Sequence, residues 1–311
     1  METPPTRLRI QAWDPSFGAE IGFAEEDDTG TVEIDLEVEK PLPDWAPVPP
    51  SRALREPVWF VDGVRRIDAR ATLDGSRGPQ PVLFASIASG TCRCDQKATV
   101  ESARVAWIML SSSQLDSDEL NLSLGRYSFR RVEEAGLAGL LNGLRQCLRE
   151  HERETAGGIS GQELVIVDGP LTGISKQHPD HLIGYVKSHR AGYLTGQAER
   201  TLLGLQTGER TPLFRINAAW PRYSFYLRLP SPTSAGDWSD LCRLELSARL
   251  SATEAIHRTE RIAGLLPRFA SSPHREPRAP QNLYPISGLE QVLRNRLGDP
   301  LIVLREIMKG A

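Results

Sequence analysis

Two aspartates in this sequence stand at the ends of apolar runs, and each is followed by glycine. Residues 163–170 read Glu-Leu-Val-Ile-Val-Asp-Gly-Pro and include Asp168, whereas residues 58–63 read Val-Trp-Phe-Val-Asp-Gly and include Asp62. Consecutive apolar residues are typical of a strand buried on both faces, and the glycine lets another group approach the backbone closely. Open α/β sheets bind ligands at such carboxyl strand ends. The alternative is an Asp-Gly turn that merely ends each strand.

Two strand-end aspartates and a glutamate from an adjoining helix would suit a metal-dependent phosphodiesterase. Carboxylate oxygens suit Mg²⁺ or Mn²⁺, and two such ions about 3.5 to 4 Å apart stabilise the attacking and leaving oxygens of an in-line displacement. Lys187 ends a later apolar run, where it could neutralise the transition state or position a water, or could be a solvated lysine. Tyr284 could orient a phosphate or could pack as an amphipathic ring at a turn.

The clearest helix in the sequence spans residues 132–155. At about 100° per residue its apolar stripe contains Leu137, Leu140, Leu141, Leu144, Cys147, Leu148 and His151. Glu152 lies at the edge of this stripe, from which a carboxylate can lean over the sheet beneath. Glu134 and Glu154 also fall at edges, so the periodicity does not choose among them. We interpret His151, inside the stripe, as a core histidine.

The remaining patterns predict a mixed α/β fold. The strand that carries Asp62, the alternating stretch 67–73 and the candidate strands 82–92 and 99–110 form an antiparallel meander. Further strands are expected at 163–168, 181–186, 211–219, 223–229 and 241–248. Ser251 with Glu254 predicts a capping box that starts a helix of about four turns, and Ser287 with Glu290 predicts a second box that opens the final helix.

The first 56 residues are expected to form a separate N-terminal region before the main domain, 57–311. Residues 1–50 carry a net charge of −9 out of a total of −3, which leaves +6 for the rest of the chain. Residues 31–39 alternate apolar and acidic side chains and predict a half-buried strand with an acidic outer face. That face either discourages unwanted strand pairing or contacts a partner. The proline-rich stretch 41–57 predicts a stiff connector.

Composition indicates a soluble globular protein, and we expect it to be cytoplasmic and not bound to a membrane. No run approaches the roughly eighteen apolar residues of a membrane span, and the N-terminus lacks the pattern of a signal peptide. The spacing of the four cysteines does not match a zinc site, and we expect them to be reduced, mostly buried thiols. Nucleophile elbows, phosphate-binding loops and dinucleotide fingerprints are absent from the sequence.

Five short blocks, taken in order, resemble the bacterial branch of the NurA nuclease family. They are Phe60-Val61-Asp62-Gly63, the Leu148-Arg149-x-x-Glu152 helix, Val165 to Leu171 around Asp168, Gly184 to His189 around Lys187, and Asn282-Leu283-Tyr284-Pro285. The likeness runs from about Pro57 to Pro300. It implies an RNase H-like mixed sheet flanked by helices, whose carboxylates bind Mn²⁺ (or Mg²⁺) and cut DNA.

The resemblance also implies roles for single residues. Asp62 and Asp168 match metal ligands, and Glu152 is chosen as the helix ligand because its interval before Asp168 is close to the family's. Tyr284 matches the late tyrosine. Archaeal members carry a histidine about two turns after that tyrosine, and this sequence has none there. Glu290 either replaces it as a ligand or serves only in the capping box.

At the level of function, the resemblance implies a homodimeric DNA end-resection nuclease with exonuclease and single-strand endonuclease activity. Its implied partner is a hexameric HerA-type ATPase that translocates DNA. The alternatives are a catalytically weak scaffold docking on a translocase, a nuclease subunit in defence against foreign DNA, and an enzyme acting on RNA or hybrids. Candidate phosphate contacts are Arg190, Arg200, Arg210, Arg215, Arg222, Arg228, Arg294 and Arg296.

Overall fold

The computed structural model describes residues 7–11, 32–75, 78–115, 117–159, 163–171, 180–187, 192–231 and 238–310. Its strands are β1 (Arg7–Ile10), β2 (Glu33–Asp35), β3 (Val58–Gly75), β4 (Gly78–Cys94), β5 (Ala98–Ser111), β6 (Glu119–Leu122), β7 (Gly125–Arg131), β8 (Leu164–Asp168), β9 (Leu182–Val186), β10 (Phe214–Asn217), β11 (Arg222–Arg228) and β12 (Leu241–Ser247). Its α-helices are α1 (Gly136–Gly157), α2 (Gly196–Leu203), α3 (Ala252–Leu265), α4 (Tyr284–Arg296) and α5 (Pro300–Gly310). Short 3₁₀ turns occur at Leu42–Asp44, Trp238–Asp240 and Leu266–Phe269.

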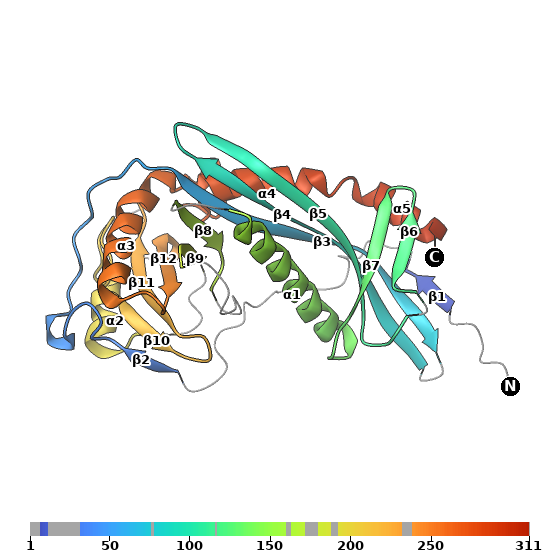
Figure 1. Ribbon diagram of the computed structural model, residues 1–311, viewed down its shortest axis with the longest axis horizontal. Helices are drawn as coiled ribbons and strands as arrows, with labels where there is room; N and C mark the ends of the chain where they lie inside the picture. The colour runs from blue at the N-terminus through green and yellow to red at the C-terminus, as the bar shows by residue number, and fades with distance from the viewer. Residues whose placement is uncertain are drawn as a thin grey trace.

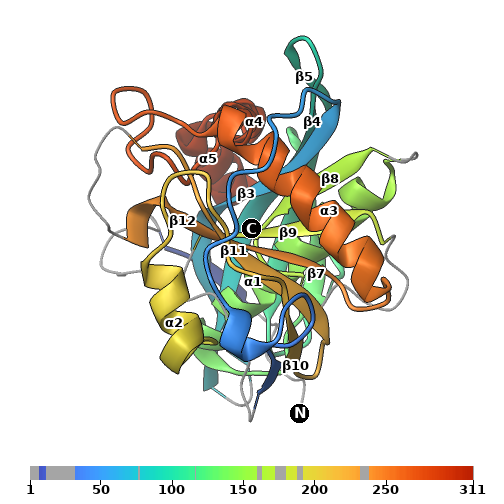
Figure 2. The same cartoon turned by 90° about the vertical axis from the view of Figure 1, so that its left-hand side faces the viewer.

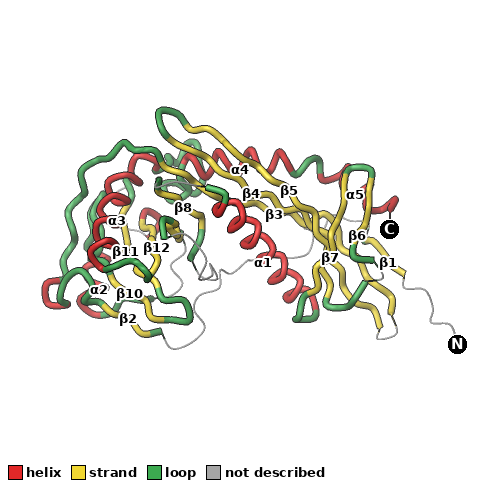
Figure 3. Tube along the Cα trace, viewed as in Figure 1, coloured by secondary structure: helices red, strands yellow, loops and turns green. Residues whose placement is uncertain are grey.

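Within the described residues, these strands form one mixed sheet with helices along it (Figures 1 and 3). The order across the sheet is β2-β10-β11-β12-β9-β8-β3-β4-β5-β7-β6, and β1 pairs with β3 outside this path. The predicted α/β class is confirmed, and the architecture is consistent with an RNase H-like fold.

The predicted antiparallel meander is formed by β3, β4 and β5. The stretch that carries Asp62 and the alternating stretch 67–73 belong to one continuous strand of 18 residues, β3, with a bulge between Ile67 and Ala69. Asp68, at this bulge, is buried and accepts hydrogen bonds from Arg66, Ser86 and Tyr127. The bulge therefore carries a buried polar network and keeps the long strand paired on both sides of it.

Parallel pairing places β8 between β3 and β9. Val61 pairs with Val167, so Asp62 and Asp168 are the next residues on adjacent strands. Because side chains alternate along a strand and neighbouring strands keep the same alternation, these two aspartates project from the same face of the sheet.

The two faces of β3 are covered by different helices. Leu140, Leu144 and Leu148 of α1 pack against one face, with Leu83 and Ile87 of β4. On the other face, the main core joins Phe60 and Ile166 of the sheet to α3 and α4, through Ile262, Leu265, Leu289 and Leu293. Figures 1 and 2 show α1 and α4 on opposite sides of the β3–β4 pair. Asp62 is two residues after Phe60 in β3, so its side chain lies on the same face of the sheet and faces α4. Gly63, the next residue, faces α1.

The helix expectations are mostly confirmed. In α1, His151 is buried and its Nδ1 lies 2.7 Å from Ser89 Oγ, as expected of a core histidine. Leu137, however, is 39% exposed; the helix begins at Gly136, so this residue lies in its first turn. Ser251 caps α3 by accepting a hydrogen bond from the Glu254 amide at 3.2 Å. The sequence patterns gave no sign of α2 or of the separate helix α5.

Part of the acidic N-terminal stretch packs against the sheet. Of residues 31–39, only Glu33–Asp35 forms a strand, which pairs with β10. Glu39 was predicted on the acidic outer face, and this is wrong: it accepts two hydrogen bonds of 2.8 Å from Arg210, whose side chain is 1% exposed. The proline-rich connector also contributes Trp45, which is buried against Phe214. The division at residue 56 stays a prediction.

Replacing Glu39 by alanine should destabilise the fold by about 3–5 kcal/mol, because it leaves the buried Arg210 guanidinium without its carboxylate. Glu33→Ala, at an exposed position of β2, is the matched control and should change stability by less than about 0.5 kcal/mol. Urea unfolding of both variants measures the difference. Equal stabilities would show that the Glu39–Arg210 pair does not anchor this segment.

Candidate metal centre

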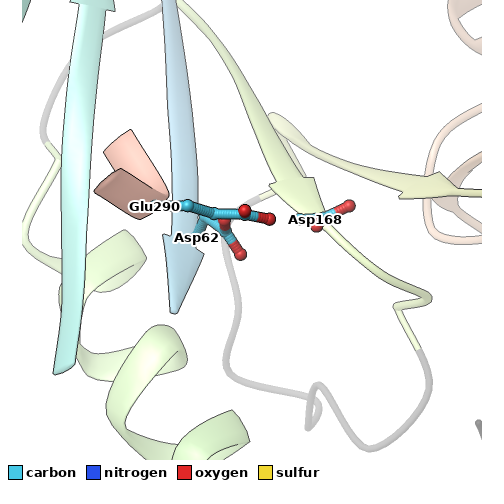
Figure 4. A group of neighbouring side chains, drawn as sticks. All are labelled: Asp62, Asp168 and Glu290. Carbon is cyan, nitrogen blue, oxygen red and sulfur yellow. The ribbon is translucent and has the colours of Figure 1, made fainter. Parts of the chain in front are cut away.

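Three carboxylates from three separate elements meet at one point of the molecule. Asp62 comes from β3, Asp168 is the last residue of β8, and Glu290 lies in α4. One oxygen from each lies within 4.8 Å of the others. Figure 4 shows the side chains of Asp62 and Glu290 extending toward Asp168. The prediction that Asp62 and Asp168 converge is therefore confirmed.

Packing of α4 brings Glu290 to the aspartates. Gly90 of β4 pairs with Asp62, and a Cβ built on Gly90 would lie 3.0 Å from Leu293 and 3.2 Å from Leu289. The glycine thus lets α4 sit close to the strand pair at the level of Asp62. Glu290, next to Leu289 in the helix, is carried to the same level.

The Asp62 carboxylate is buried with an oxygen that the protein leaves without a hydrogen bond. Asp62 is 4% exposed; its Oδ1 accepts the Gly63 amide at 2.7 Å, whereas its buried Oδ2 has no hydrogen-bond partner among the described residues. Burial, followed by repulsion from Asp168, raises the pKa of Asp62 well above its usual range, although Lys187 opposes the shift. Buried anionic oxygens of this kind fit a hard divalent cation such as Mn²⁺ or Mg²⁺.

Lys187 belongs to the site. Its Nζ donates to Asp168 Oδ2 at 2.6 Å and to Asn282 Oδ1 at 3.0 Å, which argues against a merely solvated lysine. Burial would lower the pKa of Lys187, but the charges of Asp168 and Asp62 outweigh it and raise that pKa. The ammonium therefore remains charged beside Asp168.

Glu152 approaches from the opposite face of the sheet. A Cβ built on Gly63 would lie 2.4 Å from Glu152 Oε1, so this carboxylate rests on the glycine backbone. The sequence-based expectation that the Asp-Gly glycine permits a close approach is confirmed here. Burial and then the charge of Asp168 raise the pKa of Glu152 to about 8, against the opposing charges of Arg149 and Arg65. Glu152 lies outside the group of three oxygens, and its role as a ligand stays a prediction.

The predicted capping box at Ser287 is wrong. The helix α4 begins three residues earlier, at Tyr284, with Pro285 in its first turn and Leu283 as its N-cap. Ser287 lies inside the helix and its Oγ donates to Glu276 Oε2 at 2.6 Å. Glu290 is therefore not a capping residue, and it faces the aspartates instead.

Tyr284 lies at the start of α4, and its hydrogen bonds are with Ser272. The phenol oxygen accepts the Ser272 amide at 3.2 Å and lies 2.6 Å from Ser272 Oγ, and the side chain is 38% exposed. The described contacts do not join it to the three carboxylates. Its predicted role in orienting a phosphate stays a prediction.

No family model matches this chain, and no curated protein matches it. Among the described helices, none combines the length and the apolar character that crossing a membrane requires.

Residues just before α4 complete the site, and the sequence patterns did not assign them. Asn282 is fully buried and its Nδ2 donates to Glu276 Oε2 at 2.9 Å, while its oxygen holds Lys187. Arg278 donates to Glu276 Oε1 at 3.4 Å and to Glu290 Oε2 at 2.7 Å. The only sequence signal for this network was that Asn282 stands in the block that contains Tyr284 and Pro285.

Several of the candidate phosphate-binding arginines are structural. Arg210, Arg222 and Arg228 are buried, and each is paired with an acid: Glu39, Glu245 and Asp240 respectively. These three assignments are wrong. Arg200 and Arg296 are exposed, Arg215 lies over the ring of Tyr223, Arg294 pairs with Glu290, and Arg190 lies outside the described residues.

Replacing Asp62 by asparagine should stabilise the metal-free protein and abolish stabilisation by Mn²⁺. The amide removes a buried charge that Asp168 repels. Because the raised pKa of Asp62 shows that its charged form opposes folding, we expect the melting temperature of the metal-free variant to rise. Thermal unfolding in chelator and in excess Mn²⁺ measures both effects.

The control for this variant is Asp44→Asn, at an exposed aspartate outside the group. It should match the wild type in both conditions. An Asp62→Asn protein that is less stable without metal and still gains stability from Mn²⁺ would contradict the assigned centre.

Stability without metal should also depend on the ionisation of Glu152. The pKa of Glu152 rises from its ordinary 4.5 to about 8 in the folded state, so the folded protein favours the protonated acid. This stabilisation is complete below about pH 4.5 and is lost as the pH rises through about 8. Glu152→Gln should remove most of the fall in stability across this window, which for a pKa raised from 4.5 to about 8 is roughly 5 kcal/mol. Urea unfolding in chelator at several pH values tests this; an unchanged slope would refute it.

Proposed function

We propose that this chain is a divalent-metal-dependent deoxyribonuclease. The observation that carries the proposal is the group formed by Asp62, Asp168 and Glu290, in which one oxygen from each residue lies within 4.8 Å of the others. Asp62 also has a buried oxygen that receives no hydrogen bond from the described residues. These three residues would hold Mn²⁺ or Mg²⁺, which when bound would stabilise charge on the oxygens of a phosphodiester.

The chain's own residues contribute charge and position. Lys187 keeps its charge beside Asp168 and limits the repulsion among the acids. Its ammonium also provides positive charge where a phosphate would lie. Glu152 is proposed as a further ligand from across the Gly63 backbone, and Tyr284 as a residue that orients the phosphate from the exposed start of α4.

Substrate and partners follow from the resemblance to the NurA family. Its blocks around Asp62, Glu152, Asp168, Lys187 and Asn282 lie about the end of β8 and the adjacent part of β3, which supports a common function for them. We propose DNA as the substrate, with exonuclease and single-strand endonuclease activity in end resection. A homodimer working with a HerA-type hexameric ATPase is part of the same proposal.

A non-catalytic scaffold is the second candidate. The observation that favours it is that Lys187 already pairs with Asp168 and Arg278 with Glu290, so two of the three acids have cationic partners. Calorimetric titration with Mn²⁺ separates the candidates. Binding that disappears in both Asp62→Asn and Asp168→Asn supports the enzyme, and the absence of such binding supports the scaffold.

Replacing Asp168 by asparagine should reduce Mn²⁺-dependent degradation of linear DNA by on the order of 10³-fold or more while the protein stays folded. Asp62→Asn should cost about as much as the double variant, since residues that act as a unit are non-additive. The control is Asp74→Asn, at a half-exposed position of the same strand as Asp62. DNA degradation assays with circular dichroism measure both quantities. Full activity of Asp168→Asn would reject the proposed centre.

A further inference from the structure

An arginine-rich pocket adjoins the carboxylates. Its volume is about 590 Å³, and among the residues that line it are Gly63, Arg65, Arg66, Arg278, Glu290 and Arg294. Glu290 is shared with the three-carboxylate group, and Gly63 directly follows Asp62. The size is within the range of small-ligand sites and exceeds what a lone inorganic anion needs.

The arginines of this pocket differ in how far the protein already uses them. Arg66 is occupied: it donates to Asp68 at 2.7 Å, to the Leu297 carbonyl at 2.9 Å and to the Gly298 carbonyl at 2.6 Å. It ties β3 to the end of α4 and neutralises the carbonyls there, which would otherwise repel an anion.

Arg278 and Arg294 retain unused donors. Arg294 is 66% exposed at its side chain, and its one hydrogen bond among the described residues is a 3.4 Å contact to Glu290. Arg278 is 52% exposed and uses its guanidinium on Glu276 and Glu290. A guanidinium has five N–H donors in a fork that matches phosphate oxygens, so both side chains can contact an anion in the pocket.

Positive charge also accumulates behind the pocket. The pKa of Arg65 is lowered by burial and then by the neighbouring charge of Arg145, with Arg149 adding to the effect and Glu152 opposing it. Three guanidiniums therefore share the vicinity of one carboxylate. The residues that line the pocket include four arginines and one acidic residue, Glu290, so positive charge is in excess there. Asp68 and Glu276, which are not among the lining residues, form ion pairs with Arg66 and Arg278.

We propose that this pocket binds a phosphate of the DNA strand adjacent to the phosphodiester at the carboxylate group. The inference rests on the proposed function and specifies how the substrate is held. The pocket begins at Gly63 and Glu290, so a strand whose reacting phosphate lies at the three carboxylates continues directly into it. Arg294 and Arg278 are phosphate-positioning residues, and the remaining volume accommodates the attached sugar.

The test compares Arg294→Gln with Arg305→Gln. Arg305 is an exposed arginine on helix α5 and is not among the pocket residues, so its replacement removes the same charge at a position outside the pocket. Binding of a fluorescent single-stranded oligonucleotide is measured by anisotropy in chelator, which prevents cleavage, at several salt concentrations. Thermal shift with inorganic pyrophosphate probes the pocket without DNA.

Arg294→Gln should weaken oligonucleotide binding about three- to tenfold and lower the salt slope by about 0.7, the value for one phosphate contact on a single strand. It should also diminish the stabilisation by pyrophosphate. Arg305→Gln should match the wild type in all three measurements. Indistinguishable behaviour of the two variants, or no effect of pyrophosphate on the wild type, overturns the inference.

The outcomes separate this inference from the proposed function. A wild type that binds pyrophosphate and oligonucleotide through Arg294 but does not cut DNA with Mn²⁺ supports the pocket and rejects the nuclease. A wild type that cuts DNA while Arg294→Gln keeps its full salt slope supports the nuclease and rejects the pocket.

Discussion

Negative charge buried between a sheet and a helix is the constraint on which this part of the molecule depends. The parallel register of β3 and β8 leaves Asp62 and Asp168 side by side on the face that α4 covers, and Glu290 joins them from that helix. Charges this close repel strongly where at least one of them, Asp62, is buried. Burial and then this repulsion raise the pKa of Asp62, and the ammonium of Lys187 opposes the shift. A divalent cation would offset the remainder, and this relation connects the architecture to the proposed chemistry.

One strand serves two faces of the site because side chains alternate along it. Asp62 points to α4 and the next residue, Gly63, faces α1, where the missing side chain is replaced by the carboxylate of Glu152. The second Asp-Gly pair uses its glycine differently: Gly169 has a φ of +104° and, among the described residues, no neighbour in the space of a Cβ, so it serves the turn of the backbone. Two identical dipeptides thus have different physical requirements, one for close approach and one for conformation.

The parts of the site that could be predicted from the sequence are those with local signals. The apolar run that ends in Asp168 correctly predicts the end of β8, and the stripe of α1 places Glu152 at an edge. The matching prediction that Asp62 ends its strand is wrong, because β3 continues through the alternating residues after it to Gly75. Contacts between residues far apart in the sequence were not predicted, because the residues adjacent to each partner carry no pattern that indicates the contact. The spacing of Ser287 and Glu290 matched a capping box, yet Pro285 begins the helix earlier and tertiary packing gives Glu290 another role. Arg210, Arg222 and Arg228 resembled surface cations, but acids distant in the sequence pair with them in the core.

A chain of hydrogen bonds joins Asp168 to Glu290 through the loop before α4. Lys187 links Asp168 to Asn282, Glu276 receives bonds from Asn282 and Arg278, and Arg278 reaches Glu290. The same loop therefore fixes the positions of carboxylates that come from a strand and from a helix. Because Arg278 also lines the pocket, Glu290 and an anion bound in the pocket would compete for hydrogen bonds from the same guanidinium. A Glu290 carboxylate that turned toward a cation would release N–H donors for a phosphate, so occupancy of the carboxylate group and of the pocket would favour each other.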